Sequence, residues 1–234
     1  MPVALITGAS RGLGRALSDA LAERGWTLVL DARGARPLEH AAHELRGRGA
    51  ADVLAIAGDV TDPAHRRDLR DVVAECGGLD LLVNNASTLG ASPLPPLLAH
   101  DADTLRRVYD VNVFAPLALI ALTAPLLASR AGTVVNIGSD AAVNAYPAWG
   151  GYGSAKAALE HIGATLAVEH PGFAVHSFDP GDMDTDLHRL ACPGEDLSHL
   201  PRPADVVPAL LRLIDERPPS GRHTAATLGA AVLS

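Results

Sequence analysis

Residues 3–14 read Val-Ala-Leu-Ile-Thr-Gly-Ala-Ser-Arg-Gly-Leu-Gly. The apolar run over 3–7 predicts a buried strand, and Leu13, Leu17 and Leu21 fall on one face of a helix that follows the glycines. Glycines permit a tight turn and a close approach of the backbone to a phosphate, whose charge suits the free N–H groups of a helix N-terminus. A glycine turn alone is common punctuation, but strand, turn and helix in this order predict a dinucleotide-binding unit.

Apolar runs of this kind recur along the chain and alternate with helical patterns. They cover 3–7, 27–31, 53–57, 79–83, 132–138 and 173–178. The alternation predicts an α/β protein with one doubly wound parallel sheet of the Rossmann type, in three α/β/α layers, and a ligand at the carboxyl ends of the strands. Because neither a repeat nor a linker is visible, we expect one dinucleotide-binding and catalytic domain over 1–234. The segment 182–203 is long for a connection and is interpreted as a substrate lid, with a plain surface excursion as the alternative.

The composition is typical of a globular protein with an acidic surface. Hydrophobic residues make up 48% of the 234, and the net charge of −8 comes without a basic block, so no nucleic acid partner is expected. Cys76 and Cys192 make no disulfide framework, and the chain starts on the strand and glycine loop instead of a signal pattern. A cytoplasmic location follows as an expectation.

The longest apolar stretch runs from Val111 to Leu127 and contains Asn112, Thr123 and two prolines. We expect it to be too short and too interrupted to span a membrane, so no membrane partner is predicted. As a helix it is apolar on more than one face, which indicates burial or cover by a partner subunit.

Tyr152 and Lys156 lie four residues apart in a helical pattern, so the Lys156 ammonium can stand beside the Tyr152 phenol. A phenol with its ordinary pKa of about 10 is a poor base, and a neighbouring cation is expected to lower that pKa. Ser139, thirteen residues upstream, could hold the oxygen of a carbonyl or alcohol beside the phenol. These three side chains predict a site that moves a proton on and off a carbinol oxygen while a nicotinamide moves the hydride.

The order of these motifs resembles the short-chain dehydrogenase/reductase family, and the resemblance runs from Val3 to about Gly221. The matching segments are Thr7–Gly14, Asp59-Val60, Asn84-Asn85-Ala86, Asn112, Ser139 with Tyr152 and Lys156, and Pro180-Gly181 with Thr185. The resemblance implies an oxidoreductase acting on CH–OH or C=O groups, with Ser139, Tyr152 and Lys156 as catalytic residues and Asn112 holding a relay water. It implies a cofactor site made of Gly8, Ser10, Arg11, Gly12, Leu13, Gly14, Arg33, Asp59, Val60, Asn85, Ala86, Tyr152, Lys156, Pro180, Gly181 and Thr185.

Family members commonly pair through the helix of 111–127 and the helix that carries Tyr152, which implies a homodimer or homotetramer. The chain departs from the family pattern at three places. Ser87 stands where the family usually has glycine, Gly138 stands where a second serine is common, and the usual Asp-Gly-Gly near the C-terminus is absent. The last departure puts the final strand, and assembly through it, in question.

Two arginines point to NADP as the cofactor. Asp31 lies twenty-three residues beyond Gly8, near the position of the acid that binds the ribose 2′-hydroxyl of NAD. The NAD-selecting acid of the family aligns with Ala32 instead, and Arg33 follows where NADP-dependent members carry arginine. With Arg11 in the glycine loop, two guanidinium groups suit a 2′-phosphate. NAD, with Asp31 reading the ribose, is the alternative.

The remaining alternatives concern function and substrate. A regulatory protein that binds the dinucleotide and senses redox state without turnover is the non-enzymatic alternative. Ten histidines show no closed ligand pattern and the Gly-x-Ser-x-Gly elbow is absent, so neither a metal nor a serine hydrolase is predicted. The substrate is expected to be a small, fairly apolar carbonyl or alcohol, and Tyr146 and Trp149 either line its pocket or pack their loop.

Overall fold

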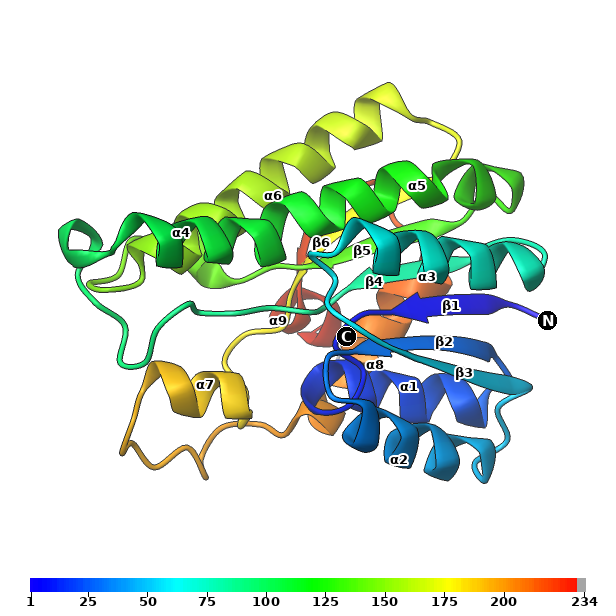
Figure 1. Ribbon diagram of the computed structural model, residues 1–234, viewed down its shortest axis with the longest axis horizontal. Coiled ribbons are helices and arrows are strands. Elements are labelled where there is room, and N and C mark those ends of the chain that lie inside the picture. Colours follow the sequence, from blue (N-terminus) through cyan, green and yellow to red (C-terminus); the bar gives the residue numbers. More distant parts are fainter. Residues whose placement is uncertain (231–234) are drawn as a thin grey trace.

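The computed structural model describes residues 1–230, and its centre is a parallel sheet of seven strands in the order β3-β2-β1-β4-β5-β6-β7 (Figure 1). The strands are β1 Val3–Ile6, β2 Thr27–Ala32, β3 Asp52–Ala57, β4 Leu81–Asn84, β5 Thr133–Ile137, β6 Ala174–Asp179 and β7 Gly221–Thr224. The helices are α1 Gly12–Glu23, α2 Ala35–Arg46, α3 Pro63–Glu75, α4 Ala102–Tyr109, α5 Ala115–Ser129, α6 Gly150–Glu169, α7 Asp186–Ala191, α8 Pro203–Glu216 and α9 Ala225–Ala230. The predicted doubly wound α/β fold is confirmed.

Strand β1 lies between β2 and β4, so the chain turns outward from the middle of the sheet in both directions. This reversal of strand order opens a crevice at the carboxyl ends of β1 and β4, which is where open α/β sheets bind their ligands. Helices α1, α2 and α8 cover one face of the sheet and α3, α5 and α6 cover the other (Figure 1).

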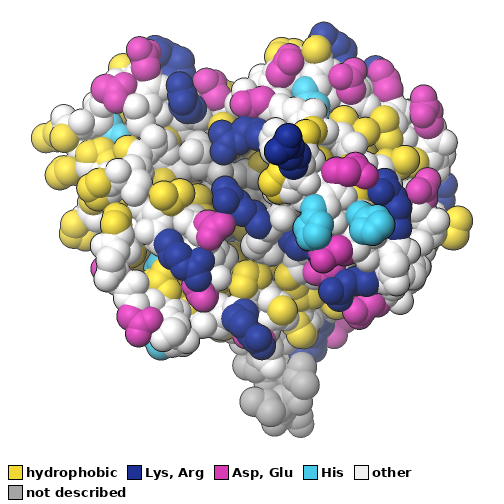
Figure 2. Space-filling view, turned by 60° about the horizontal axis from the view of Figure 1, so that its bottom comes forward, with side chains coloured by type: hydrophobic (Ala, Val, Ile, Leu, Met, Phe, Trp, Pro, Cys, Tyr) yellow, Lys and Arg dark blue, Asp and Glu magenta, His cyan; other side chains and the backbone are white. Residues whose placement is uncertain are grey.

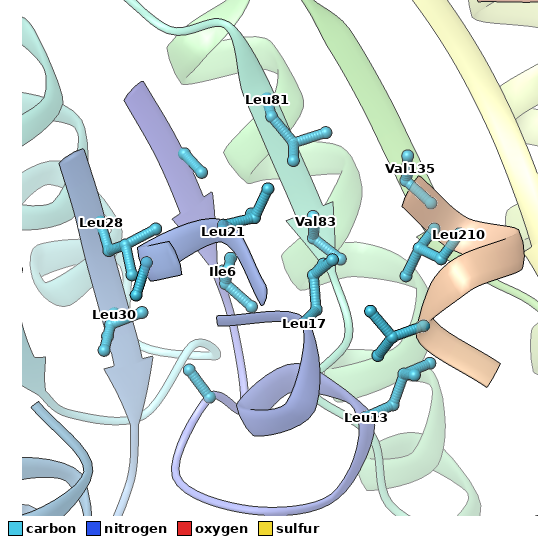
Figure 3. Close-up of a cluster of buried hydrophobic side chains, with 14 of the residues drawn as sticks. Ile6, Leu13, Leu17, Leu21, Leu28, Leu30, Leu81, Val83, Val135 and Leu210 are labelled. Atoms are coloured by element: carbon cyan, nitrogen blue, oxygen red, sulfur yellow. The ribbon is translucent and has the colours of Figure 1, made fainter. Parts of the chain in front are cut away.

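Leucine, isoleucine and valine fill the layer on each side of the sheet. On one face Ile6 and Leu28 meet Leu17 and Leu21 of α1 (Figure 3). Residues that alternate with these along the strands point to the other face, where they join a cluster of Leu5, Val29, Leu82, Leu119, Ile120 and Leu127. A strand buried on both faces must be apolar throughout, which is why the strands appear in the sequence as continuous apolar runs.

The seventh strand is absent from the sequence-based prediction. Strand β7 runs parallel to β6, with His176 opposite Gly221 and Asp179 opposite Thr224. Its residues Gly-Arg-His-Thr contain no apolar run. An edge strand pairs with one neighbour only, and here the hydrogen bonds to β6, not burial of apolar side chains, fix its position. The family-based doubt about a final strand was wrong.

The long helical stretch 102–129 consists of α4, a π-helical turn at Asp110–Phe114, and α5. By length and composition alone, this helical stretch could cross a membrane. The sequence analysis considered only residues 111–127 and judged them too short, whereas the helical stretch in the structure is longer. Leu119, Ile120 and Leu127 of α5 lie in the core against the sheet, so a role as a core helix accounts for this character. Because only 44% of its most apolar stretch is buried, cover by a partner subunit stays a prediction.

A buried histidine makes the stability of this fold sensitive to acid. His176 on β6 is fully buried, and neither ring nitrogen has a hydrogen-bond partner among the described residues. Burial, with the nearby His223 ring, lowers the pKa of His176 to about 4. The unfolded chain therefore binds more protons between pH 6.5 and pH 4, and we expect about 3 kcal/mol of stability to be lost as the pH falls through this window.

Urea unfolding of the wild type and of His176→Leu, measured at about pH 7 and about pH 4.5, tests this expectation. The leucine variant should lose much less stability over the same interval, because it has no ring to protonate. His199→Gln, at an exposed position, is the control and should behave as the wild type does. Equal acid sensitivity in His176→Leu and wild type would contradict the assignment.

Candidate active site

A cleft of about 1510 Å³ opens at the carboxyl ends of the central strands and holds most of the predicted site residues. The space-filling view shows a hollowed face with basic side chains gathered in and around the hollow (Figure 2). The predicted residues that line the cleft are Gly8, Ser10, Arg11, Gly12, Leu13, Arg33, Asp59, Val60, Asn85, Ala86, Ser139, Tyr152, Lys156, Pro180, Gly181 and Thr185. Gly14 and Asn112 do not line the cleft. Each contacts a residue that does: Gly14 lies against Asn85, and Asn112 accepts a hydrogen bond from Ser87.

The glycine loop has a backbone that only glycine adopts easily. Gly8 and Gly12 have φ of +66° and +59°, in the left-handed region. A Cβ on Gly14 would lie 2.5 Å from Asn85 Nδ2 and 2.8 Å from the Gly8 carbonyl oxygen. Helix α1 begins at Gly12, and no side chain caps its first N–H groups. Those free N–H groups and the open space at Gly12 fit a pyrophosphate.

Asn85 and Thr7 fasten the loop after β4 to the glycine loop. The Asn85 side chain donates hydrogen bonds to the carbonyl oxygens of Thr7 and Gly8 at 2.8 and 3.1 Å. The Thr7 hydroxyl accepts from the backbone N–H groups of Asn85 and Ala86, each at 3.0 Å. Two adjacent loops therefore form one rigid floor for the cofactor.

Tyr152 and Lys156 are both buried on α6, with the Lys156 Nζ 5.5 Å from the centre of the Tyr152 ring. Nζ donates a 2.7 Å hydrogen bond to the carbonyl oxygen of Ile137. Burial lowers the pKa of Lys156 to about 8. Burial also raises the pKa of Tyr152 to about 12.

The sequence-based expectation that Lys156 lowers the phenol pKa was therefore wrong for this structure. Removing the phenol from water penalises the phenolate, and the carboxylates of Asp140 and Asp179 penalise it further. The Lys156 ammonium is directed at a backbone oxygen instead of the phenol oxygen. At neutral pH Tyr152 is consequently a protonated group that can donate, and Lys156 is a cation.

Ser139 lies at the end of β5, where it also caps the short turn Asp140–Ala142. Its hydroxyl oxygen accepts from the backbone N–H of Ala141 at 3.1 Å and lies 3.2 Å from Asp140 Oδ1. A Cβ on Gly153 would lie 2.6 Å from the Ala141 carbonyl oxygen, so α6 packs directly on this turn. The close approach brings Ser139 and Tyr152 into the same wall of the cleft.

Asn112 occupies the π-helical turn and is fully buried. Its side-chain NH₂ donates to the carbonyl oxygens of Thr88 and Val108 at 2.8 and 2.9 Å. Its Oδ1 accepts from the Ser87 hydroxyl at 2.7 Å. The amide thus fixes the loop beside the cleft, and the relay water stays a prediction.

Sequence reasoning recorded Ser87 as a departure from the family but gave it no role. Its hydroxyl is placed to hydrogen-bond the Tyr152 phenol. The Ser87 hydroxyl donates to Asn112 Oδ1 at 2.7 Å, and its hydrogen bond with the phenol lowers the pKa of Tyr152 against the larger effect of burial. The serine at position 87, where the family usually has glycine, was the feature of the sequence that could have pointed to this role.

The two arginines predicted for a 2′-phosphate have different surroundings. Arg11 donates to Asp186 of α7 at 3.0 Å, across the mouth of the cleft. Arg33 is exposed at the end of β2 and makes no hydrogen bond or ion pair within 1–230. Of the two, Arg33 is therefore the guanidinium group that has no partner to release in the part of the chain that the structure describes, and the binding of a 2′-phosphate by both arginines stays a prediction.

Asp31, the alternative reader of the ribose, is also engaged. Its side chain is 1% exposed, and its Oδ1 lies 2.6 Å from His65 Nε2. Sequence reasoning missed His65, because no local pattern links two residues on separate elements.

The segment 182–203 forms one wall of the cleft through Met183, Leu187, His188, Leu190, Cys192 and Glu195, and its role as a moving lid stays a prediction. Opposite, Tyr146 and Trp149 line the cleft and also pack within their loop. The Tyr146 hydroxyl donates to Asp140 at 2.7 Å, and Trp149 meets the Tyr152 ring edge-to-face at 5.8 Å.

Comparison with known proteins is consistent with this geometry. A sequence model of the short chain dehydrogenase family matches residues 2–195. The chain is 36% identical over 201 residues to a sepiapterin reductase of Meriones unguiculatus, covering 81% of this chain and 77% of the relative. An alcohol dehydrogenase of Thermococcus sibiricus complexed with 5-hydroxy-NADP superposes with a TM-score of 0.86 at 27% identity, covering 96% and 95% of the two chains. A short chain dehydrogenase of Shigella flexneri 2a complexed with NADP gives 0.89 at 27% identity, covering 95% of each.

Proposed function

The chain belongs to the short-chain dehydrogenase/reductase family, oxidoreductases that act on CH–OH and C=O groups, and from this premise we propose that it uses NADP(H) with Tyr152 as the acid and base. One observation carries the proposal. Tyr152, Lys156 and Ser139 stand in the same cleft as the glycine loop and an unpaired exposed Arg33. A sensor that only binds dinucleotide has no need of a proton donor beside a hydroxyl.

The residues present fit a dinucleotide. Gly8, Gly12 and the N-terminus of α1 would hold the pyrophosphate, and Arg33 would pair with the 2′-phosphate. When bound, reduced NADP supplies the hydride, while the protein orients the reactants and controls the proton. That the solved relatives named above were complexed with NADP or a derivative supports this choice.

Proton transfer is the part of the reaction that this chain's own residues perform. Ser139 hydrogen-bonds the carbonyl oxygen, and the Tyr152 phenol gives it a proton as the oxygen becomes an alcohol. Lys156 stays cationic below a pKa of about 8 and, as a predicted cofactor-binding residue of the cleft, would help to hold the dinucleotide. Because burial keeps Tyr152 protonated, the unliganded site is prepared for reduction. Oxidation would run the same steps in reverse.

The choice of NADP over NAD predicts a large effect of one exposed arginine. Arg33→Ala removes the proposed partner of the 2′-phosphate, and charge-assisted hydrogen bonds contribute about 1.5–3 kcal/mol. We expect KM for NADPH to rise about 10- to 150-fold and KM for NADH to stay nearly constant, as measured by steady-state kinetics.

Arg36→Ala is the matched control, because Arg36 is an exposed arginine on α2 that does not line the cleft. It should leave both KM values unchanged. A wild-type preference for NADH would overturn the NADP assignment and favour an NAD-dependent alcohol dehydrogenase.

Turnover separates an enzyme from a redox sensor. We expect the absorbance of NADPH to fall when the protein is mixed with a panel of small ketones and aldehydes. The apolar group around Tyr152, formed by Leu89, Leu94, Trp149 and Leu187, supports small, fairly apolar carbonyls as substrates. Tight binding of NADPH without turnover of any member would favour the sensor. A homodimer or homotetramer and a cytoplasmic location are parts of the proposal that size measurement and fractionation can examine.

A further inference from the structure

We propose that His65 selects NADP by binding the Asp31 carboxylate and withholding it from the adenosine ribose, an inference that rests on the proposed function above. Sequence patterns alone made Asp31 an argument for NAD. The structure places a second residue against it and reverses that argument.

The pair is built at the floor of the cofactor cleft. Asp31 precedes the last residue of β2 and lines the cleft, while His65 lies in the first turn of α3. His65 Nε2 is 2.6 Å from Asp31 Oδ1, and the exposed fractions of the two side chains are 7% and 1%. The Gly8 backbone hydrogen-bonds the same carboxylate, so Asp31 touches the phosphate-binding loop itself.

Gly58 makes room for the imidazole. A Cβ at this position would lie 2.2 Å from His65 Nδ1 and 2.5 Å from its Cε1. No neighbouring atom could shift far enough to relieve contacts this short, because the ring is itself buried. Position 58 must therefore stay free of a side chain for the ring to reach Asp31.

Charge explains what the pair does. The hydrogen bond that Asp31 accepts from His65 raises the pKa of His65, and burial raises the pKa of Asp31, so both shifts favour keeping one proton between the two groups. The pair is neutral as a whole wherever that proton resides. A neutral pair beside Arg33 does not oppose the 2′-phosphate of NADP.

Loss of the histidine would reverse this balance. An unpaired Asp31 carboxylate would repel a 2′-phosphate and could accept a hydrogen bond from the 2′-hydroxyl of NAD. The other acids near the pair, Asp59 beside Asp31 and Asp62 and Asp68 near His65, add further negative charge. Arg33 would then be the cation left to balance that charge at the adenosine end of the cleft.

The test measures Kd for NADPH and for NADH by quenching of tryptophan fluorescence, in the wild type, His65→Ala, Asp31→Asn and the double variant. We expect His65→Ala to raise the ratio of Kd(NADPH) to Kd(NADH) about tenfold or more. Asp31→Asn should leave the ratio within about threefold of wild type, because it removes the repelling charge. The double variant should return to the same range, since the histidine matters only while the carboxylate is present.

His40→Ala is the matched control, because His40 is an exposed histidine on α2 outside the cleft, and it should leave the ratio unchanged. If His65→Ala does not fold, His65→Gln carries the test: it keeps a hydrogen bond to Asp31, lacks the charge, and should shift the ratio in the same direction. A folded His65 variant with the wild-type ratio, or a double variant that keeps the shifted ratio, overturns the inference. A wild type that binds neither dinucleotide, or prefers NADH, defeats the proposed function instead.

Discussion

Tyr152→Phe is expected to lower kcat for carbonyl reduction by about 10²–10⁴-fold, the range that a general acid contributes, while the Kd for NADPH stays unchanged. The reason lies in the buried phenol. Burial raises its pKa to about 12, so Tyr152 holds its proton at neutral pH and gives it up only when the substrate oxygen becomes basic. Phenylalanine keeps the ring and its edge-to-face contact with Trp149 but has no proton to give.

Single-turnover reduction with NADPH measures this effect free of product release, and fluorescence titration measures Kd separately. Tyr109→Phe is the control, because Tyr109 packs on Phe114 outside the cleft and should keep wild-type turnover. A Tyr152→Phe enzyme with wild-type turnover would show that another group supplies the proton. Equal loss of NADPH affinity would instead indicate a structural role for the hydroxyl.

The second large effect is expected at Gly14. In Gly14→Ala the new Cβ would lie 2.5 Å from Asn85 Nδ2 and 2.8 Å from the Gly8 carbonyl oxygen, and the backbone oxygen cannot turn away. The change breaks the contact that holds the two loops of the cofactor floor together. We expect the free energy of unfolding to fall by about 1–3 kcal/mol, as for an overpacked interior, and kcat/KM for NADPH to fall by about 10²-fold through misplacement of the loop. Urea unfolding and steady-state kinetics measure the two losses.

Gly12→Asn serves as the contrasting variant. Gly12 also has positive φ, but its Cβ would meet no atom within 4 Å, and asparagine tolerates this conformation. We expect its stability to change by less than about 1 kcal/mol, while the side chain enters the open space of the cleft and weakens NADPH binding. If Gly14→Ala leaves both stability and NADPH kinetics as in wild type, the loops are not coupled as described.

The fold was readable from the sequence because parallel strands buried on both faces must be apolar along their whole length. The apolar runs 3–7 and 79–83 therefore marked β1 and β4, and the glycines that follow β1 marked the turn into α1. Strand β7 could not be predicted from the sequence, for the opposite reason. An edge strand of Gly-Arg-His-Thr is held by pairing with β6, and pairing leaves no mark on local composition.

The candidate site likewise has features that the sequence predicts and features that it does not. Spacing on one helix predicted that Tyr152 and Lys156 lie together, because the helical repeat fixes their separation. It did not predict the direction of the phenol pKa, because the penalty of burial depends on elements packed from elsewhere. The Asp31–His65 pair joins residues from different strand–helix units and could not be seen without the tertiary fold.

The ion pair between Arg11 and Asp186 connects the cofactor half of the cleft to the substrate half. Arg11 belongs to the glycine loop, and Asp186 begins the helix whose next residue, Leu187, faces the substrate space. A cofactor phosphate that drew Arg11 away would free α7, and a substrate that moved α7 would alter the hold on Arg11. Occupancy of one half would then be thermodynamically linked to occupancy of the other, equally in both directions. Because the pair is exposed, this reciprocal coupling amounts to no more than about 1 kcal/mol, or roughly fivefold in affinity.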